Sequence, residues 1–252
     1  MNIPVIYEDD DLLIIDKPAG ITVNRAETTK HETTVQDWAE NKLYITYKKT
    51  NIKYGDEGWT PESEFNQRGG IVHRLDKETS GILVLAKNSQ VFVELQRQFR
   101  EREVKKIYQA LAHGKILPKE GEINVPVGRL PWNKKQFGII PGGKESKTLY
   151  KVLEYYVDSK SREEYSLVEL YPQSGRTHQI RVHLKYIGHP IFSDFLYAGR
   201  KTARNDRKKL ERVFLHAAGI SFKHPAKKSE VSFESSLPLN LKELLKTFDK
   251  IV

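Results

Sequence analysis

Short apolar runs separated by polar turns recur along this chain, and only a few stretches have the spacing of a helix. Such runs are typical of β-strands. They fall at residues 5–7, 12–15, 71–72, 82–86, 104–113, 121–128, 146–156, 165–171, 213–222 and 230–234. Apolar residues at helical spacing predict helices at 33–43, from Ser89 onward, from Thr177 onward and at 239–248. Because strands and helices are mixed in order, the expected fold class is α+β.

The most informative stretch is residues 69–87, with the sequence GGIVHRLDKETSGILVLAK. Two apolar runs enclose a polar segment whose centre is Asp76, with Arg74 and Lys77 on either side. Nearby cations favour the ionised form of a carboxylate, which suits Asp76 to act as a nucleophile or a base. The alternative is a tight connection in which the Asp76 side chain accepts hydrogen bonds from turn amides.

A second informative stretch is residues 175–184, with the sequence GRTHQIRVHL. If Thr177 is the N-cap, one apolar face of a helix consists of Ile180, Leu184 and Ile187. His178, Arg181 and Lys185 then share another face, which presents Arg181 away from the apolar side. Gly188 is a natural end for this helix.

These two stretches carry a resemblance to a known family. Residues 73–81, HRLDKETSG, resemble the HRLDxxTSG signature of the RluA-like pseudouridine synthases. Residues 17–20 are similar to the family's KPAG segment, 106–110 to its KxYxA motif, 175–183 with 188–197 to its third motif, and 215–217 to its LHA segment. The motifs occur in the family's order and cover the chain from Lys17 to about Phe233.

The resemblance implies a mixed, mostly antiparallel central sheet with flanking helices and a central active-site cleft. We expect one catalytic domain over residues 1–252. Many family members carry an N-terminal S4 domain, but here the KPAG segment begins at Lys17, so none is expected. Residues 43–68 have a weak pattern and are longer than the family's usual lead-in, so we expect a loop or an irregular insertion there.

The implied activity is isomerisation of uridine to pseudouridine in ribosomal or transfer RNA. The N-glycosidic bond breaks, and C5 of the base joins C1′ of the ribose. This chemistry needs no cofactor and no metal. A stacked nucleotide is inaccessible, so we expect the target to be flipped out of the RNA.

By resemblance, Asp76 is the nucleophile or base, Arg181 pairs with Asp76, and Tyr108 lies against the target base. Pattern alone favours a packing role for Tyr108 in a strand. Arg74 is expected to fill the space that the flipped base vacates or to contact phosphate. Further RNA-binding residues are expected to be Lys77, Thr79, Arg176, His178 and Ile180.

The net charge of +9 favours a polyanionic partner, above all RNA. Two segments leave alternatives open. The basic and aromatic mix at 130–143 suits either RNA contact or an exposed hairpin, and the cations of 196–212 suit either a mobile surface loop or RNA backbone contact. An acidic N-terminus, no run of ~20 apolar residues and no cysteine favour a cytoplasmic protein without a membrane partner. We expect a monomer.

Two rival functions follow from the same sequence. The basic charge supports a non-catalytic RNA-binding or ribosome-assembly protein equally well, and the feature that discriminates against it is Asp76 within its intact motif. Eight histidines suggest a metal-dependent hydrolase. However, His178 and His183 are five residues apart, which puts them on one face of neither a helix nor a strand, and there is no HExxH spacing.

Overall fold

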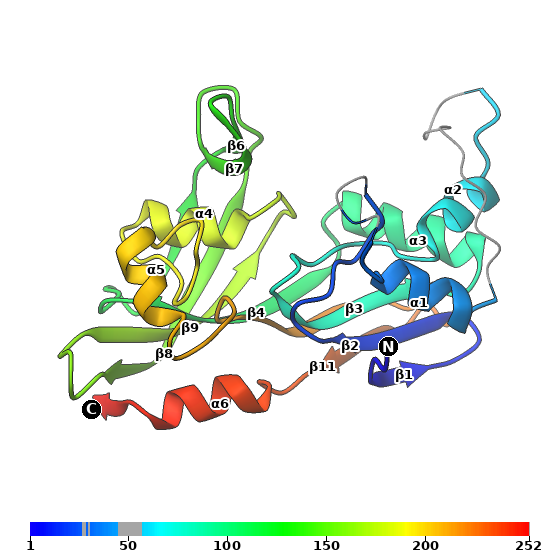
Figure 1. Ribbon diagram of the computed structural model, residues 1–252. Helices are drawn as coiled ribbons and strands as arrows, with labels where there is room; N and C mark the ends of the chain where they lie inside the picture. The colour runs from blue at the N-terminus through cyan, green and yellow to red at the C-terminus, as the bar shows by residue number, and fades with distance from the viewer. Residues whose placement is uncertain (27–28, 30, 45–56, 252) are drawn as a thin grey trace. The chain divides into compact units, whose positions relative to one another are not determined.

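A computed structural model of the chain describes residues 1–251 except 27–28, 30 and 45–56. The chain forms two compact units (Figure 1). Unit 1 consists of Met1–Val104 and Ile220–Ser235, and unit 2 consists of Lys105–Gly219 and Ser236–Val252. Each unit has its own strands and helices. Strand β10 (Leu215–Lys223) begins in unit 2 and ends in unit 1.

In unit 1, strands β1 (Val5–Glu8), β2 (Leu12–Lys17) and β3 (Ser80–Ala86) lie side by side and run antiparallel. Strand β11 (Glu230–Glu234) pairs with β10. Every residue of β3 is buried. This explains why residues 82–86 of the strand form a continuous apolar run and do not alternate between apolar and polar residues.

The helices of unit 1 are α1 (Val35–Lys42), α2 (Pro61–Arg68) and α3 (Ser89–Arg100). Each begins after a polar N-cap whose side chain accepts a backbone N–H in the first turn; the caps are Thr34, Thr60 and Asn88. Helices α2 and α3 contribute Phe65 and Phe92 to the hydrophobic core over β2 and β3.

Two expectations for unit 1 are wrong. Helix α2 occupies part of the stretch expected to be a loop, where Thr60 and Pro61 supply an N-cap and a preferred first residue. The rest of that expectation falls largely on residues 45–56, outside the described residues. Residues 71–72 do not form a strand, since Ile71 makes only an isolated bridge to Leu85 before the chain turns away.

In unit 2, strands β4 (Lys105–His113), β9 (Glu164–Pro172), β8 (Lys147–Val157) and β12 (Asp249–Ile251) follow one another across an antiparallel sheet. Strand β5 (Glu120–Asn124) also pairs with β8. Strands β6 (Val127–Leu130) and β7 (Asn133–Ile139) form a separate hairpin. The segment 130–143 is therefore largely part of a hairpin.

The helices of unit 2 are α4 (Gln179–Tyr186), α5 (Arg200–Asp206) and α6 (Leu239–Lys246). Figure 1 shows α4 and α6 on opposite sides of the β8–β9 pair. Their apolar residues, Leu184 and Leu244, belong to one core with Val168 of β9. The α+β class with mostly antiparallel strands is confirmed. Within the described residues, no helix has the length and apolar character needed to span a bilayer.

The N-cap expected for α4 is wrong. The residue before the helix is His178, not Thr177, and it lies in the left-handed region at φ 57° without making a side-chain cap. The polar residue that stabilises this turn is Gln179. Its Oε1 accepts hydrogen bonds from the Ser174 hydroxyl (2.8 Å) and the Arg176 N–H (3.0 Å).

Candidate active site

The loop between Ile71 and β3 carries four of the predicted site residues. Arg74 and Lys77 are exposed, Asp76 is half-buried and Thr79 is buried. The Thr79 N–H donates to the Asp76 carbonyl at 3.1 Å, which closes a tight turn directly before β3. Asp76 thus begins a turn that ends at the buried Thr79. The Asp76 side chain remains partly accessible to solvent.

The KPAG turn is fastened to this loop through Lys17. The Lys17 side chain is fully buried, and its ammonium donates to the carbonyls of Pro18 (2.8 Å), Ile21 (3.0 Å) and Lys77 (3.2 Å). The Gly20 N–H donates to the same Lys77 carbonyl at 2.8 Å. A buried ammonium is tolerated only when acceptors surround it, so these contacts fix the two turns to each other.

His73 joins the loop to β3. Its Nε2 accepts the Val84 N–H at 3.0 Å, so that nitrogen carries no proton. If the antiparallel pairing continued beyond the Ile71–Leu85 bridge, the Val72 carbonyl would accept the Val84 N–H. The His73 side chain takes the place of that carbonyl. The His73 ring also stacks on Phe99, with 4.7 Å between ring centroids.

Position 70, three residues before His73, requires glycine. Gly70 has φ 74°, and a Cβ at this position would lie 2.4 Å from the Ala86 carbonyl oxygen. The Ala86 N–H donates to the Gly70 carbonyl at 2.8 Å. No side chain fits so close an approach between the two backbones.

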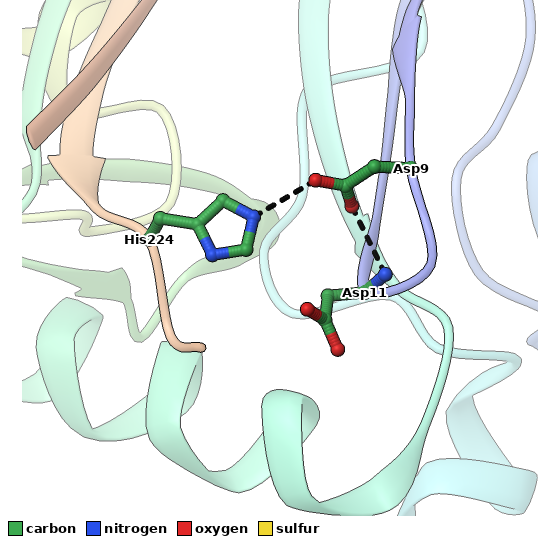
Figure 2. A group of neighbouring side chains, drawn as sticks. All are labelled: Asp9, Asp11 and His224. Atoms are coloured by element: carbon green, nitrogen blue, oxygen red, sulfur yellow. Dashed lines mark hydrogen bonds and ion pairs between the residues drawn. The ribbon is translucent and has the colours of Figure 1, made fainter. Parts of the chain in front are cut away.

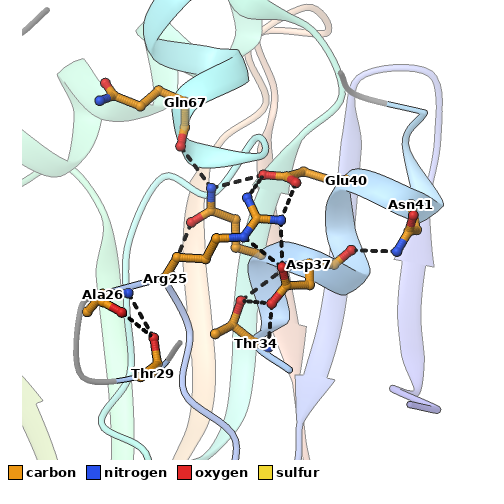
Figure 3. A network of polar contacts seen from close by, with 9 residues as sticks. Arg25, Ala26, Thr29, Thr34, Asp37, Glu40, Asn41 and Gln67 are labelled. Atoms are coloured by element: carbon orange, nitrogen blue, oxygen red, sulfur yellow. Dashed lines mark hydrogen bonds and ion pairs between the residues drawn. The ribbon is translucent and has the colours of Figure 1, made fainter. Parts of the chain in front are cut away.

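A network of polar side chains links α1 and α2 near the start of the Asp76 loop (Figure 3). Arg25 donates to both oxygens of Glu40 (2.7 and 2.5 Å) and to Asp37 (2.6 Å). Gln36 donates to Glu40 (2.9 Å) and to the Gln67 carbonyl (2.8 Å), two residues before Gly69. The network therefore joins α1 to the end of α2, where the path into the loop begins.

Arg181 lies in unit 2, and its partner there is Asp194. Arg181 donates through Nε (2.7 Å) and Nη2 (2.8 Å) to the two carboxylate oxygens. Asp194 also accepts the N–H groups of Leu196 (3.0 Å) and Tyr197 (3.2 Å). Arg181 is 7% exposed and Asp194 is fully buried, so this ion pair lies largely away from solvent.

Tyr197 connects this ion pair to the β6–β7 hairpin. Its hydroxyl accepts the Phe137 N–H at 3.0 Å and lies 2.8 Å from Nδ1 of His178. The Arg181 guanidinium lies 5.0 Å from the centroid of the Tyr197 ring.

The other predicted residues of unit 2 are dispersed around this centre. Arg176 is half-buried and donates to the Glu145 carbonyl at 3.3 Å, and Ile180 is buried in the core. Tyr108 lies on β4 opposite Leu170, half-buried against the core. The ammonium of Lys106 donates to the Ser174 carbonyl at 3.1 Å, which joins the strand of Tyr108 to the turn that precedes Arg176.

A group with metal-ligand chemistry lies elsewhere in unit 1 (Figure 2). It consists of Asp9, Asp11 and His224. However, Asp9 accepts hydrogen bonds from His224 (3.0 Å), the ammonium of Lys227 (2.7 Å) and two backbone N–H groups. Burial would raise the pKa of Asp9, but these donors together with the Tyr7 hydroxyl hold it well below its usual value. The Lys227 ammonium already supplies the charge that a metal would bring, so the group acts as a structural clamp.

Comparisons with known proteins agree with these observations. The family model described as RNA pseudouridylate synthase matches residues 11–186. The chain is 37% identical to ribosomal large subunit pseudouridine synthase D of Neisseria meningitidis serogroup B, over 97% of this chain and 61% of the relative. It is 34% identical to an uncharacterised RNA pseudouridine synthase of Bacillus subtilis, over 99% of this chain and 74% of the relative.

A solved structure is similar as well. Human RNA pseudouridylate synthase domain containing 1 matches with a TM-score of 0.74 and 26% identity, over 99% of this chain and 89% of that chain. The chain spans about three fifths of the length of the Neisseria relative, 61%. The family model and the relatives extend over both the Asp76 loop and the Arg181 helix, and the chain therefore belongs to the RNA pseudouridylate synthase family.

Proposed function

We propose that this chain is an RNA pseudouridine synthase, an isomerase that converts uridine to pseudouridine within RNA. The observation that carries the proposal is the setting of Asp76. The loop is fastened by Lys17, His73 and the Gly70 backbone, whereas the carboxylate remains partly exposed. A carboxylate held rigidly at an accessible turn is suited to attack or to accept a proton from a bound nucleotide.

In the proposed reaction the bond between N1 and C1′ breaks and a bond between C5 and C1′ forms. The proton lost from C5 is balanced by one gained at N1, so the reaction consumes no co-reactant. Asp76 begins the reaction as nucleophile or base. Arg181 pairs with it and fixes the orientation of its carboxylate. A guanidinium has five N–H donors, and Asp194 engages two of them, so one arginine can serve two carboxylates.

Tyr108 packs against the face of the target uracil in this proposal. Its half-buried ring, supported from behind by the unit 2 core, suits a stacking surface. Arg74, exposed on the Asp76 loop, fills the space vacated by the flipped nucleotide or contacts phosphate. These contacts, together with a central cleft that receives the nucleotide, complete the proposed site within one catalytic domain.

Of the five further residues expected to bind RNA, we propose Lys77, Arg176 and His178 as contacts, but not Thr79 and Ile180. The structure bears on these residues unequally. The Lys77 ammonium lies 2.8 Å from Glu32 in an exposed pair, which phosphate can replace at little loss. Thr79 and Ile180 are buried, so they support the site from beneath. The β6–β7 hairpin adds Trp132, which is 78% exposed and suited to stacking on a base.

The proposed substrate is ribosomal RNA, because relatives such as the Neisseria protein are named ribosomal large subunit pseudouridine synthases. Transfer RNA is the alternative substrate. We propose that the enzyme acts in the cytoplasm on such RNA, as a monomer and without a cofactor.

The test is tritium release from RNA that contains 5-tritiated uridine, incubated with the purified chain. Isomerisation removes the hydrogen at C5, so the proposed enzyme releases tritium to water. Mapping pseudouridine in RNA from cells with and without the gene then identifies the modified positions. RNA binding with no tritium release from any cellular RNA would instead support the non-catalytic RNA-binding alternative.

A further inference from the structure

Helix α5 and the turn that follows it are held rigidly from the inner side. Asp206 is buried and accepts hydrogen bonds from the Ser193 N–H (2.9 Å) and from His113 (3.0 Å). The Ser193 hydroxyl donates to the Leu210 carbonyl at 2.6 Å. The segment is thus an ordered element of unit 2, in contrast to the mobile loop that was one of the two sequence expectations.

Three cations of this segment have structural roles. Arg207 donates to the Ser193 carbonyl at 3.0 Å, and Lys209 pairs with Asp158. Arg212 is buried and donates to the carbonyls of Val213 (3.1 Å) and Leu215 (2.7 Å). These side chains explain part of the basic composition without any partner molecule.

The remaining cations form what we call the α5 cationic face: Arg200, Lys201, Arg204 and Lys208. All four are exposed, and within the described part of the chain their side chains have no hydrogen-bond or ion-pair partner. Backbone bonds such as Lys208 N–H to the Asn205 carbonyl continue the helical turn past Asp206. At 3.6 residues per turn, the four positions fall within an arc of about 100°.

We propose that the α5 cationic face binds the phosphate backbone of RNA that flanks the target nucleotide. This inference rests on the proposed function. Four like charges on one rigid face repel one another, and a row of phosphates relieves that repulsion and releases counterions. Such binding is independent of base sequence.

The position of the face along the chain supports this assignment. Arg200 is six residue steps after Asp194, the partner of Arg181, and a chain of that length spans at most about 20 Å. That distance corresponds to roughly six base steps of a nucleic-acid strand, at about 3.4 Å each. The α5 cationic face therefore lies within reach of phosphates a few nucleotides from the arginine site.

The test compares two charge-matched variants of the full chain. In the first, the four cations of the α5 cationic face are replaced by glutamine: R200Q, K201Q, R204Q and K208Q. In the control, four other exposed cations of unit 2 are replaced: K160Q, R162Q, K242Q and K246Q. Both variants lose the same charge, so they separate a local contact from a general electrostatic effect.

The probe is an RNA duplex of about 20 base pairs and arbitrary sequence, titrated between about 50 and 200 mM salt. We expect the first variant to bind at least about tenfold more weakly at low salt, with a salt slope smaller by roughly three to four. The salt slope of the control variant should differ from that of the wild type by less than about one. Equal losses in the two variants, or an unchanged slope in the first, would overturn the proposal.

Because the probe contains no target site, this result does not depend on catalysis. A failure of the proposed function appears as an absence of tritium release from the wild-type chain. A failure of the present inference appears only in the comparison of salt slopes.

Discussion

The guanidinium of Arg181 and the carboxylate of Asp194 form a bidentate ion pair almost wholly removed from solvent, with N–O distances of 2.7 and 2.8 Å. The same carboxylate caps the turn at Leu196 and Tyr197. Asp194 therefore sets the rotamer of the arginine and the path of the next segment together. Arg181→Met should accordingly lose most activity.

Asp194→Asn should reduce the free energy of unfolding by about 3–5 kcal/mol, because it removes the charge of a buried carboxylate that holds the Arg181 guanidinium and two backbone N–H groups. Misplacement of Arg181 should also slow single-turnover tritium release by roughly a hundredfold. Urea denaturation and the tritium assay measure the two effects. The control is Asp158→Asn, which affects another buried aspartate, one whose pKa the Lys209 ammonium lowers to about 2. It should destabilise the chain without slowing the chemical step, and a similar slowing in both variants would contradict a specific role for Asp194.

Asp76→Asn should fold normally, bind RNA and form no pseudouridine, because the amide is neither a nucleophile nor a base. The measurement is tritium release with enzyme in excess over RNA, alongside RNA affinity. Glu78→Gln is the matched control, since Glu78 is a half-buried carboxylate two residues further along the same loop. It should retain activity. Near-wild-type release by Asp76→Asn would refute the assignment.

Lys17→Met should reduce the free energy of unfolding by about 3 kcal/mol, because three backbone carbonyls lose the buried ammonium that donates to them. The Asp76 loop should become less ordered, which faster hydrogen exchange at the Thr79 amide would report. Lys77→Met provides the contrast, since it removes an exposed ammonium from the same loop and leaves the Lys77 carbonyl in place. Equal destabilisation by the two substitutions would argue against the anchoring role of Lys17.

Tyr197→Phe should reduce the free energy of unfolding by about 1–2 kcal/mol. It leaves the Phe137 N–H without its acceptor and removes the contact with His178. Because the bond holds the hairpin, we expect KM for RNA to rise more than kcat falls, with faster exchange of the Phe137 amide. Tyr171→Phe removes a hydroxyl that donates to Glu169 on β9, and it should leave KM unchanged. A fall in kcat alone would place Tyr197 in the chemical step instead.

Stability should decline below pH 6.5 partly because of His183. This side chain is fully buried, and burial lowers its pKa below the ordinary 6.5. As the pH falls below that value, the unfolded state takes up a proton that the folded state refuses, so folding becomes less favourable until the lowered pKa is reached. Urea denaturation at about pH 5 and about pH 7.5 should show a smaller difference for His183→Gln than for the wild type. An identical difference would exclude His183 as the cause.

The residue pattern predicted those parts of the fold that depend on local periodicity. The apolar run of β3 and the spacing of Val91, Phe92 and Leu95 on α3 identify a buried strand and an amphipathic helix from sequence alone. Helix α2 was missed because its sequence, PESEFNQR, has only one apolar residue, and its signal lies in Thr60 and Pro61. Capping residues are informative in such cases, where apolar spacing is not.

The candidate site was predicted less completely, because its contacts join distant segments. Lys17 would be expected at a surface, and its burial depends on three carbonyls that converge only in the folded chain. Asp194 was noted as part of a motif, but nothing in its spacing identifies it as the partner of Arg181. The pairing of Asp76 with Arg181 stays a prediction.

The hydrogen bond between the Val84 N–H and the His73 ring joins two residues that are eleven positions apart. It closes the intervening chain, which contains the Asp76 turn, into a ring. Surface loops usually tolerate insertions, because their ends are separately fixed and their length is free. Here an added or deleted residue would shift the imidazole off the strand amide and change the register at the same time. The number of residues in this ring is thus as tightly constrained as their identity, and length variation among relatives should concentrate outside it.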